Sequence, residues 1–191
     1  MGAQGIRRTF GILLGIICLL LYAANGFGAN QSWKTCMAAA KDSFQKGEYA
    51  KAENLLNAAL DETKRFKETD PRFIITYGNM ALLYQNQQKY PQAENLYQRV
   101  LSLRRKTVPE NDPQIAKDLN NLATVLSAQG KYAAAEEPLQ TALTINEQAY
   151  GKGHPSVAIN LNNLARKMGR RILAPLSASL PPATPPRPSR R

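Results

Sequence analysis

Three asparagines that recur at intervals of 42 residues are the side chains of this sequence best placed to do chemistry: Asn79, Asn121 and Asn163. Asparagine is a poor helix former, so propensity does not explain its repetition. Its side-chain amide carries both a hydrogen-bond donor and an acceptor, the two groups needed to hold an extended peptide backbone. The same amides are also able to bond the backbone of a neighbouring segment and order the fold. The spacing therefore predicts either a peptide clamp or a structural ladder.

Catalytic and metal-binding chemistry has few residues to draw on. His154 is the single histidine, and Cys36 is the one cysteine outside the N-terminal apolar segment, so they form neither a metal site nor a nucleophile–base pair. Glu136 and Glu137 are consecutive and face different directions on a helix, so they are not a carboxylate dyad. We expect a non-enzyme without metal or cofactor. His154 should occupy a turn, and Cys36 is either a small buried residue or the site of an intermolecular disulfide.

The formal net charge of +11 lies mainly at the two ends of the chain. Residues 30–165 contain 16 basic residues and all 14 acidic ones, whereas residues 166–191 contain seven basic residues and no acidic residue. A nucleic-acid-binding domain carries a basic stripe on one folded face, which this balanced central region does not provide. We therefore expect no nucleic-acid partner.

A second set of residues repeats with the same period as the asparagines. Asp70-Pro71, Asp112-Pro113 and His154-Pro155 are each 42 residues apart and precede apolar residues at helical spacing. Asp is a favoured N-cap, and Pro fits the first position of a helix because no backbone N–H is needed there. Self-similarity with a period of this length predicts a repeat architecture.

Each period contains two helical patterns separated by a turn of the Gly-Lys-Tyr type. Small residues at Ala123 and Ala135 indicate where two antiparallel helices come closest, so we expect Ala135 to be fully buried. One helix pair cannot bury its apolar surface alone, so neighbouring repeats must stack. Three full pairs should be followed by a single helix after Pro155, because no second helical pattern follows Gly169. That helix either caps the stack or leaves apolar surface open.

On these motifs the sequence resembles the tetratricopeptide repeat family, in the 42-residue form known from kinesin light chains. The resemblance covers roughly residues 33–165. It implies an all-α helix-turn-helix solenoid of three full pairs and a terminal helix, which we assign to residues 29–173. Ser43 departs from the large residue that the family uses, and Phe44 beside it is the expected replacement. The matching residues are Leu119-Asn120-Asn121-Leu122-Ala123, Gly130-Lys131-Tyr132, Ala135-Glu136 and Ala142-Leu143; Asn79, Ala81, Tyr84, Tyr90, Ala93-Glu94 and Leu101; and Ala40, Gly47, Tyr49, Ala52-Glu53 and Ala59-Leu60.

The resemblance also implies a concave groove that is lined by the first helix of each pair. In family members that bind peptides, an asparagine at this position holds the ligand backbone, and the resemblance implies the same role here. Flanking positions on the same helices make the expected groove polar and mildly basic. The predicted groove residues are Asn79, Asn121, Asn163, Lys117, Thr124 and Arg166.

The two ends of the chain differ from the repeats. Residues 1–28 are predicted to be a signal peptide, because Arg7 and Arg8 precede an apolar run of 15 residues that ends in small residues. A spanning helix needs ~20 apolar residues, but a retained membrane anchor over residues 6–24 is the alternative. Half of the 12 prolines lie in residues 174–191, which predicts a disordered Pro- and Arg-rich tail.

These observations predict an exported protein, periplasmic or secreted, that acts as a protein–protein interaction adaptor. It would bind a peptide segment of a protein partner in its concave groove. The alternative is an assembly or scaffold subunit that acts through self-association or membrane anchoring. A homo-oligomer fits either function, and membrane contact is expected only if the N-terminal segment is retained.

Overall fold

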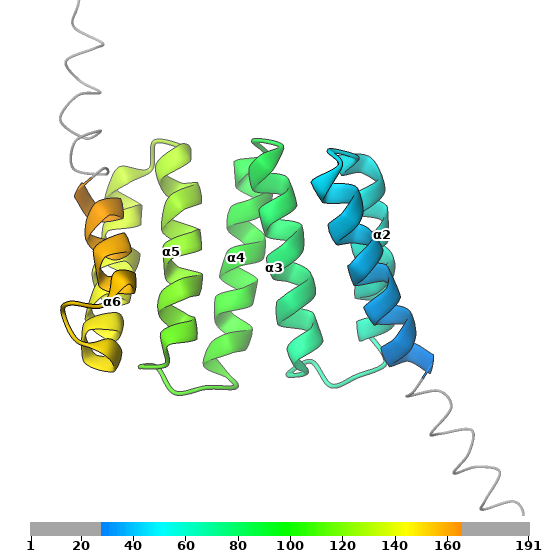
Figure 1. Ribbon diagram of the computed structural model, residues 1–191, viewed down its shortest axis with the longest axis horizontal. Helices are drawn as coiled ribbons and strands as arrows, with labels where there is room; N and C mark the ends of the chain where they lie inside the picture. Colours follow the sequence, from blue (N-terminus) through cyan, green and yellow to red (C-terminus); the bar gives the residue numbers. More distant parts are fainter. Residues whose placement is uncertain (1–27, 166–191) are drawn as a thin grey trace, which may run out of the picture. The chain divides into compact units, whose positions relative to one another are not determined.

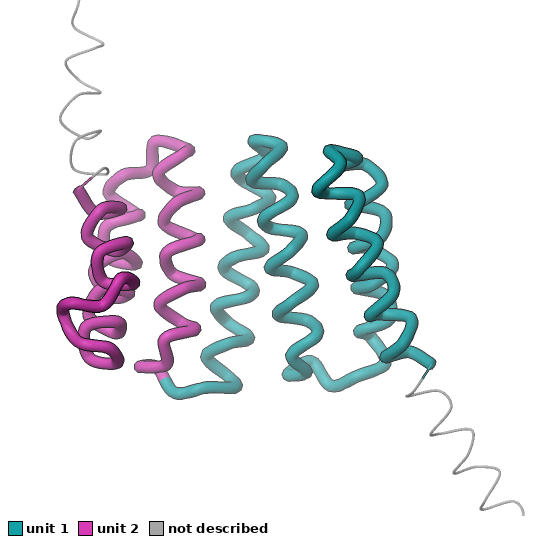
Figure 2. The backbone as a smooth tube through the Cα atoms, viewed as in Figure 1, with its two compact units in different colours: residues 1–109 teal, residues 110–191 magenta. Residues whose placement is uncertain are grey.

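The computed structural model describes residues 28–165, and every regular element in that range is a helix. The chain divides into two compact units, residues 1–109 (unit 1) and residues 110–191 (unit 2), as Figure 2 shows. Residues 1–27 of the predicted signal peptide, the predicted tail and Arg166 lie outside the described residues. We describe each unit by itself.

Unit 1 consists of two helix pairs (Figure 1). A helical segment over residues 28–45 pairs with α2 (Tyr49–Thr63), and α3 (Pro71–Asn86) pairs with α4 (Tyr90–Arg105). Helix α2 also packs against α3, so the two pairs stack on one another. The first two predicted repeats are therefore present.

Unit 2 contains the third helix pair and one further helix. Helix α5 (Pro113–Ala128) packs against α6 (Tyr132–Tyr150), and a helical segment follows over residues 155–165 (Figure 1). This arrangement is the predicted one of a full pair followed by a helix that begins at Pro155. Together the units confirm the predicted all-α helix-turn-helix solenoid fold.

The first helix of each of the last three repeats begins with the cap that the sequence predicts. The side chains of Asp70 and Asp112 accept hydrogen bonds from the backbone N–H two residues further on, at 2.9 and 2.7 Å. His154 does the same with its Nδ1, which accepts from the N–H of Ser156 at 3.2 Å. His154 thus lies in a turn, as predicted, and it also caps the following helix, which was not predicted. Each cap satisfies a backbone donor that the helix itself leaves unpaired.

The turn between the two helices of a pair requires a left-handed backbone conformation at one residue. Gly47 and Gly130 occupy this position with φ values of 76°. In the second repeat the same position holds Gln88, with a φ of 60°. A side chain in this region is strained because its Cβ approaches the following carbonyl oxygen. The repeat pattern places Gln88 in this turn, but it does not indicate that Gln88 has a left-handed backbone conformation.

The cores of both units form where the sequence places small and apolar residues. Ala52, Ala93 and Ala135 are each fully buried, with 0% of their surface exposed. The predicted burial of Ala135 is therefore confirmed. Ser43 is buried as well, and Phe44 beside it packs against the core of unit 1. In the third repeat the predicted apolar faces are buried at Ile115, Leu119, Leu122, Ala123, Leu126, Leu139, Ala142 and Leu143.

Candidate functional site

Unit 2 contains a hollow of about 450 Å³ that is open to solvent and lined by all three of its helical segments. Four of the six predicted groove residues line it, namely Lys117, Asn121 and Thr124 from α5 and Asn163 from residues 155–165. The other lining residues are Pro113, Gln114, Asn120, Asn146, Tyr150, Ser156 and Ile159. No aspartate or glutamate is among them, so Lys117 gives the hollow a local positive charge.

The three α5 residues share one face because they follow at steps of four and three positions. Lys117 is exposed and makes no ion pair within residues 28–165. The hydroxyl of Thr124 donates to the backbone carbonyl of Asn120 at 2.8 Å, within its own helix. The side chains of Asn121 and Asn163 are half-buried and make no hydrogen bond inside the described range. Their donors and acceptors therefore remain available to a ligand.

Asn146, the one buried residue among those that line this hollow, marks its floor and belongs to a chain of three hydrogen-bonded asparagines. Asn146 of α6 donates through Nδ2 to Oδ1 of Asn160 at 2.7 Å, and Asn160 donates to Oδ1 of Asn120 at 3.1 Å. Asn120 in turn donates to the backbone carbonyl of Ala116 at 3.0 Å. These amides join all three helical segments of unit 2.

Sequence reasoning missed this chain, although a signal for it exists. Thr76, Asp118 and Asn160 are 42 residues apart, and all three are buried polar residues. A polar residue that recurs at a buried helix position indicates a polar contact between helices, because buried polar groups require hydrogen-bond partners. The groove was predicted only from Asn79, Asn121 and Asn163 and from the positions that flank them.

Unit 1 has a smaller hollow of about 250 Å³, between residues 28–45, α2 and α3. The predicted residue Asn79 lines it together with Lys41 and Gln45, but most of its wall is apolar. Asn79 donates through Nδ2 to the backbone carbonyl of Ile75 at 2.8 Å, within its own helix. Within the described residues, the Asn79 amide therefore does not bond the backbone of a neighbouring repeat, which was the alternative to ligand binding for this residue. The apolar lining residues are Met37, Ala40, Phe44, Leu56 and Leu82.

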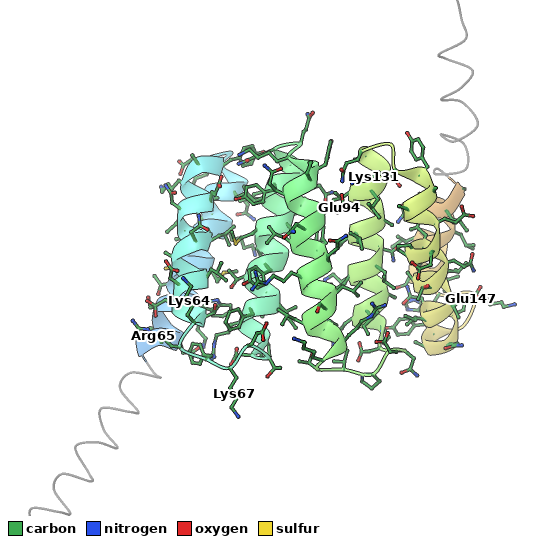
Figure 3. All side chains as sticks on the ribbon, turned by 180° about the vertical axis from the view of Figure 1, so that it is seen from behind. Lys64, Arg65, Lys67, Glu94, Lys131 and Glu147 are labelled. Atoms are coloured by element: carbon green, nitrogen blue, oxygen red, sulfur yellow. The ribbon has the colours of Figure 1, made fainter. Side chains whose placement is uncertain are left out.

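The two units differ in charge. Residues 30–109 carry 13 basic and eight acidic residues, whereas residues 110–165 carry three basic and six acidic residues. Part of the excess in unit 1 lies in the segment after α2, from which Lys64, Arg65 and Lys67 project (Figure 3). Lys64 and Arg65 pair with Asp61 and Glu62 at 2.6 and 3.5 Å. Exposed pairs of this kind contribute little to stability and leave the face solvated.

Cys36 and His154, the other residues considered for chemistry, line neither hollow. Cys36 is a half-buried free thiol in the helical segment 28–45. The ring of His154 stacks on that of Tyr150 with a centroid distance of 4.4 Å, besides its capping bond. Within the described range, no group of three or more His, Cys, Asp or Glu residues is arranged to hold a metal ion. Nor does any helix among residues 28–165 have the length and apolar character to cross a membrane.

The chain matches one family profile and is similar to several solved structures. The family profile described as tetratricopeptide repeat matches residues 36–106, 72–148 and 115–171. Among solved structures, BtubC (BKLC) from P. vanneervenii is 21% identical with a TM-score of 0.66, over 78% of this chain and 65% of that one. A putative kinesin light chain repeat protein of Podosopora anserina is 20% identical with a TM-score of 0.66, over 76% of this chain and 69% of that one.

A third similar structure is the TPR2B domain of yeast Sti1 in complex with pHsp70. It is 18% identical with a TM-score of 0.57, over 74% of this chain and 99% of that one. At these identities the likeness concerns the fold alone, and the chain spans less than two thirds of the length of BtubC. No curated protein matches the chain.

Proposed function

Since this chain belongs to the tetratricopeptide repeat family, we propose that it is a non-catalytic adaptor that binds a peptide segment of a partner protein. Repeats of this family generally mediate protein–protein interaction and are typically not enzymes. The similar Sti1 domain is in complex with pHsp70, which is a precedent for a protein ligand on this fold. The proposal places the ligand in the hollow of unit 2.

The observation that carries this proposal is the convergence in one hollow of two amides and a cation that have no partner within residues 28–165. Asn121 and Asn163 line the same hollow from two different helical segments, and Lys117 lines it with them. A peptide group offers one donor and one acceptor, so two side-chain amides can bond it whatever side chain it carries. Lys117 would add attraction for an acidic residue or a carboxylate of the partner. Asn79 and Lys41 provide a similar but more apolar setting in unit 1.

A peptide array probed with the full chain tests this function. We expect a subset of immobilised random twelve-residue peptides to be captured. The variant Asn163→Ala should weaken capture by about two- to tenfold. The matched control Asn162→Ala should not weaken it, because Asn162 is exposed and does not line the hollow. Equal losses in both variants, or capture of no peptide at all, would contradict the proposal.

Self-association is a second candidate function, favoured by one feature of the last described helix. Leu161 is 48% exposed, whereas Leu119, which is its equivalent one repeat earlier, is 3% exposed. Sedimentation of the full chain over a range of concentrations separates the two functions. A dimer that dissociates in the variant Leu161→Glu would favour an assembly role, and a monomer at all concentrations would favour the adaptor.

A further inference from the structure

We infer that Asn146, at the floor of the unit 2 hollow, accepts a hydrogen bond from a backbone N–H of the bound segment and so selects against proline at that ligand position. This inference rests on the proposed function and specifies the chemistry of its ligand. Asn146 lies on α6, outside the first-helix positions from which a groove was predicted. It is a candidate specificity-determining residue.

The orientation of the Asn146 amide follows from the fixed end of the asparagine chain. The backbone carbonyl of Ala116 can only accept, so Asn120 must direct its Nδ2 toward that carbonyl. The Oδ1 of Asn120 then accepts from Nδ2 of Asn160, and the Oδ1 of Asn160 accepts from Nδ2 of Asn146. Each amide is thereby held in one of its two flipped orientations. The oxygen of Asn146 is the acceptor left at the other end of the chain.

That acceptor is available to a ligand that enters the hollow. Asn146 is 5% exposed, and what remains accessible of it lines the hollow. No donor among residues 28–165 bonds its Oδ1, although the neighbouring Asn160 is fully buried and has its amide bonded on both sides. An acceptor that lines the hollow and has no donor within residues 28–165 is free to accept a hydrogen bond from a ligand donor. We therefore expect a bound ligand to donate an N–H or O–H group to Oδ1 of Asn146.

The charge of the hollow narrows the choice of donor. Lys117 makes the surroundings positive, and no carboxylate lines them, so a lysine or arginine of the ligand is disfavoured. A peptide N–H is neutral and is present at every residue except proline. When a peptide N–H of the ligand bonds Asn146, the carbonyl of the same peptide group can still accept a hydrogen bond from the amide of Asn121 or Asn163. The hollow thus fits an extended peptide with a non-prolyl residue over Asn146.

An N-methyl scan of a captured peptide tests the inference. One peptide selected from the array is resynthesised with each backbone nitrogen methylated in turn, and its affinity for the full wild-type chain is measured by fluorescence anisotropy. Methylation removes one donor and leaves the side chains unchanged. We expect one internal position at which methylation weakens binding at least tenfold. In the variant Asn146→Leu the same methylation should change the affinity less than twofold.

The variant Asn146→Leu leaves Oδ1 of Asn160 without its donor, which could unfold the protein. The wild-type scan can overturn the inference even in that case. A wild-type scan without any sensitive position would overturn the inference while leaving peptide binding itself intact. So would an equal loss on methylation in wild type and variant, because the effect would then be steric. If the array captures no peptide, the proposed function fails and the inference fails with it.

Discussion

The side-chain amide of Asn160 donates a hydrogen bond to Oδ1 of Asn120 at 3.1 Å, which ties the last described helix of unit 2 to α5. Asn160 is fully buried, so no water replaces this bond or the one it accepts from Asn146. An apolar residue in its place would leave a donor on Asn146 and an acceptor on Asn120 unpaired. The helix over residues 155–165 is therefore positioned by polar contacts as well as by the buried Val157.

Replacement of Asn160 should destabilise the fold. We expect Asn160→Leu to lower the free energy of unfolding by about 1–3 kcal/mol, since it leaves buried polar groups without partners. Urea unfolding followed by circular dichroism measures this change. The matched variant Asn162→Leu, at an exposed position of the same helix, should change it by less than about 0.5 kcal/mol. Equal stabilities of the two variants would rule out a structural role for the asparagine chain.

The strained turn of the second repeat offers a stabilising substitution. Gln88 has a φ of 60° where Gly47 and Gly130 occupy the equivalent turns. Relief of this strain should outweigh the greater flexibility of glycine in the unfolded chain, so Gln88→Gly should gain about 0.5–1 kcal/mol. The thermal midpoint reports the gain. Gln87→Gly is the control, because Gln87 has a φ of −79° and glycine there should only destabilise. A lower midpoint for Gln88→Gly would contradict the argument.

The close approach of the two helices in the third repeat predicts a cost for a larger side chain. Ala135 is fully buried, whereas Ala134 beside it on α6 is exposed. Ala135→Leu should overpack the pair and cost about 1–3 kcal/mol. Ala134→Leu should leave the thermal midpoint nearly unchanged. Identical thermal midpoints for the two variants would argue against a close approach of the two helices at Ala135.

The predicted signal peptide lies almost wholly outside the described residues, and its cleavage remains a proposal. We expect the mature chain to begin near Phe27 or Ala29, because the apolar run is short and ends in small residues. Intact-mass measurement of the protein exported by its native host decides this. A mature chain that still contains Met1 or Cys18 would instead favour the membrane anchor over residues 6–24.

Local signals in the sequence were sufficient to predict the helices and their pairing. The caps at Asp70 and Asp112 and the small residue Ala135 act within one repeat, where spacing alone fixes their neighbours. The positions of Lys117 and Asn121 on one face of α5 also followed from spacing, and both line the same hollow.

Contacts between helices that are distant in sequence were not predictable in this way. The bond between Asn146 and Asn160 joins two helical segments whose angle and separation no periodicity specifies. The left-handed conformation of Gln88 was not predicted for a different reason. Its left-handed conformation is imposed by the turn, while its residue type carries no signal for such a conformation.

The proposed peptide site in the unit 2 hollow is tested by the affinity of a captured peptide for the double variant Asn121→Ala, Asn163→Ala, which removes two amides that line the hollow. Each lost hydrogen bond removes about 0.5–1.5 kcal/mol, so binding should be at least about fivefold weaker than in the wild type, with unchanged helical circular dichroism. Wild-type affinity in the double variant would contradict it. A large fall in the thermal midpoint together with lost binding would contradict it as well, because the two amides would then support the fold rather than the ligand.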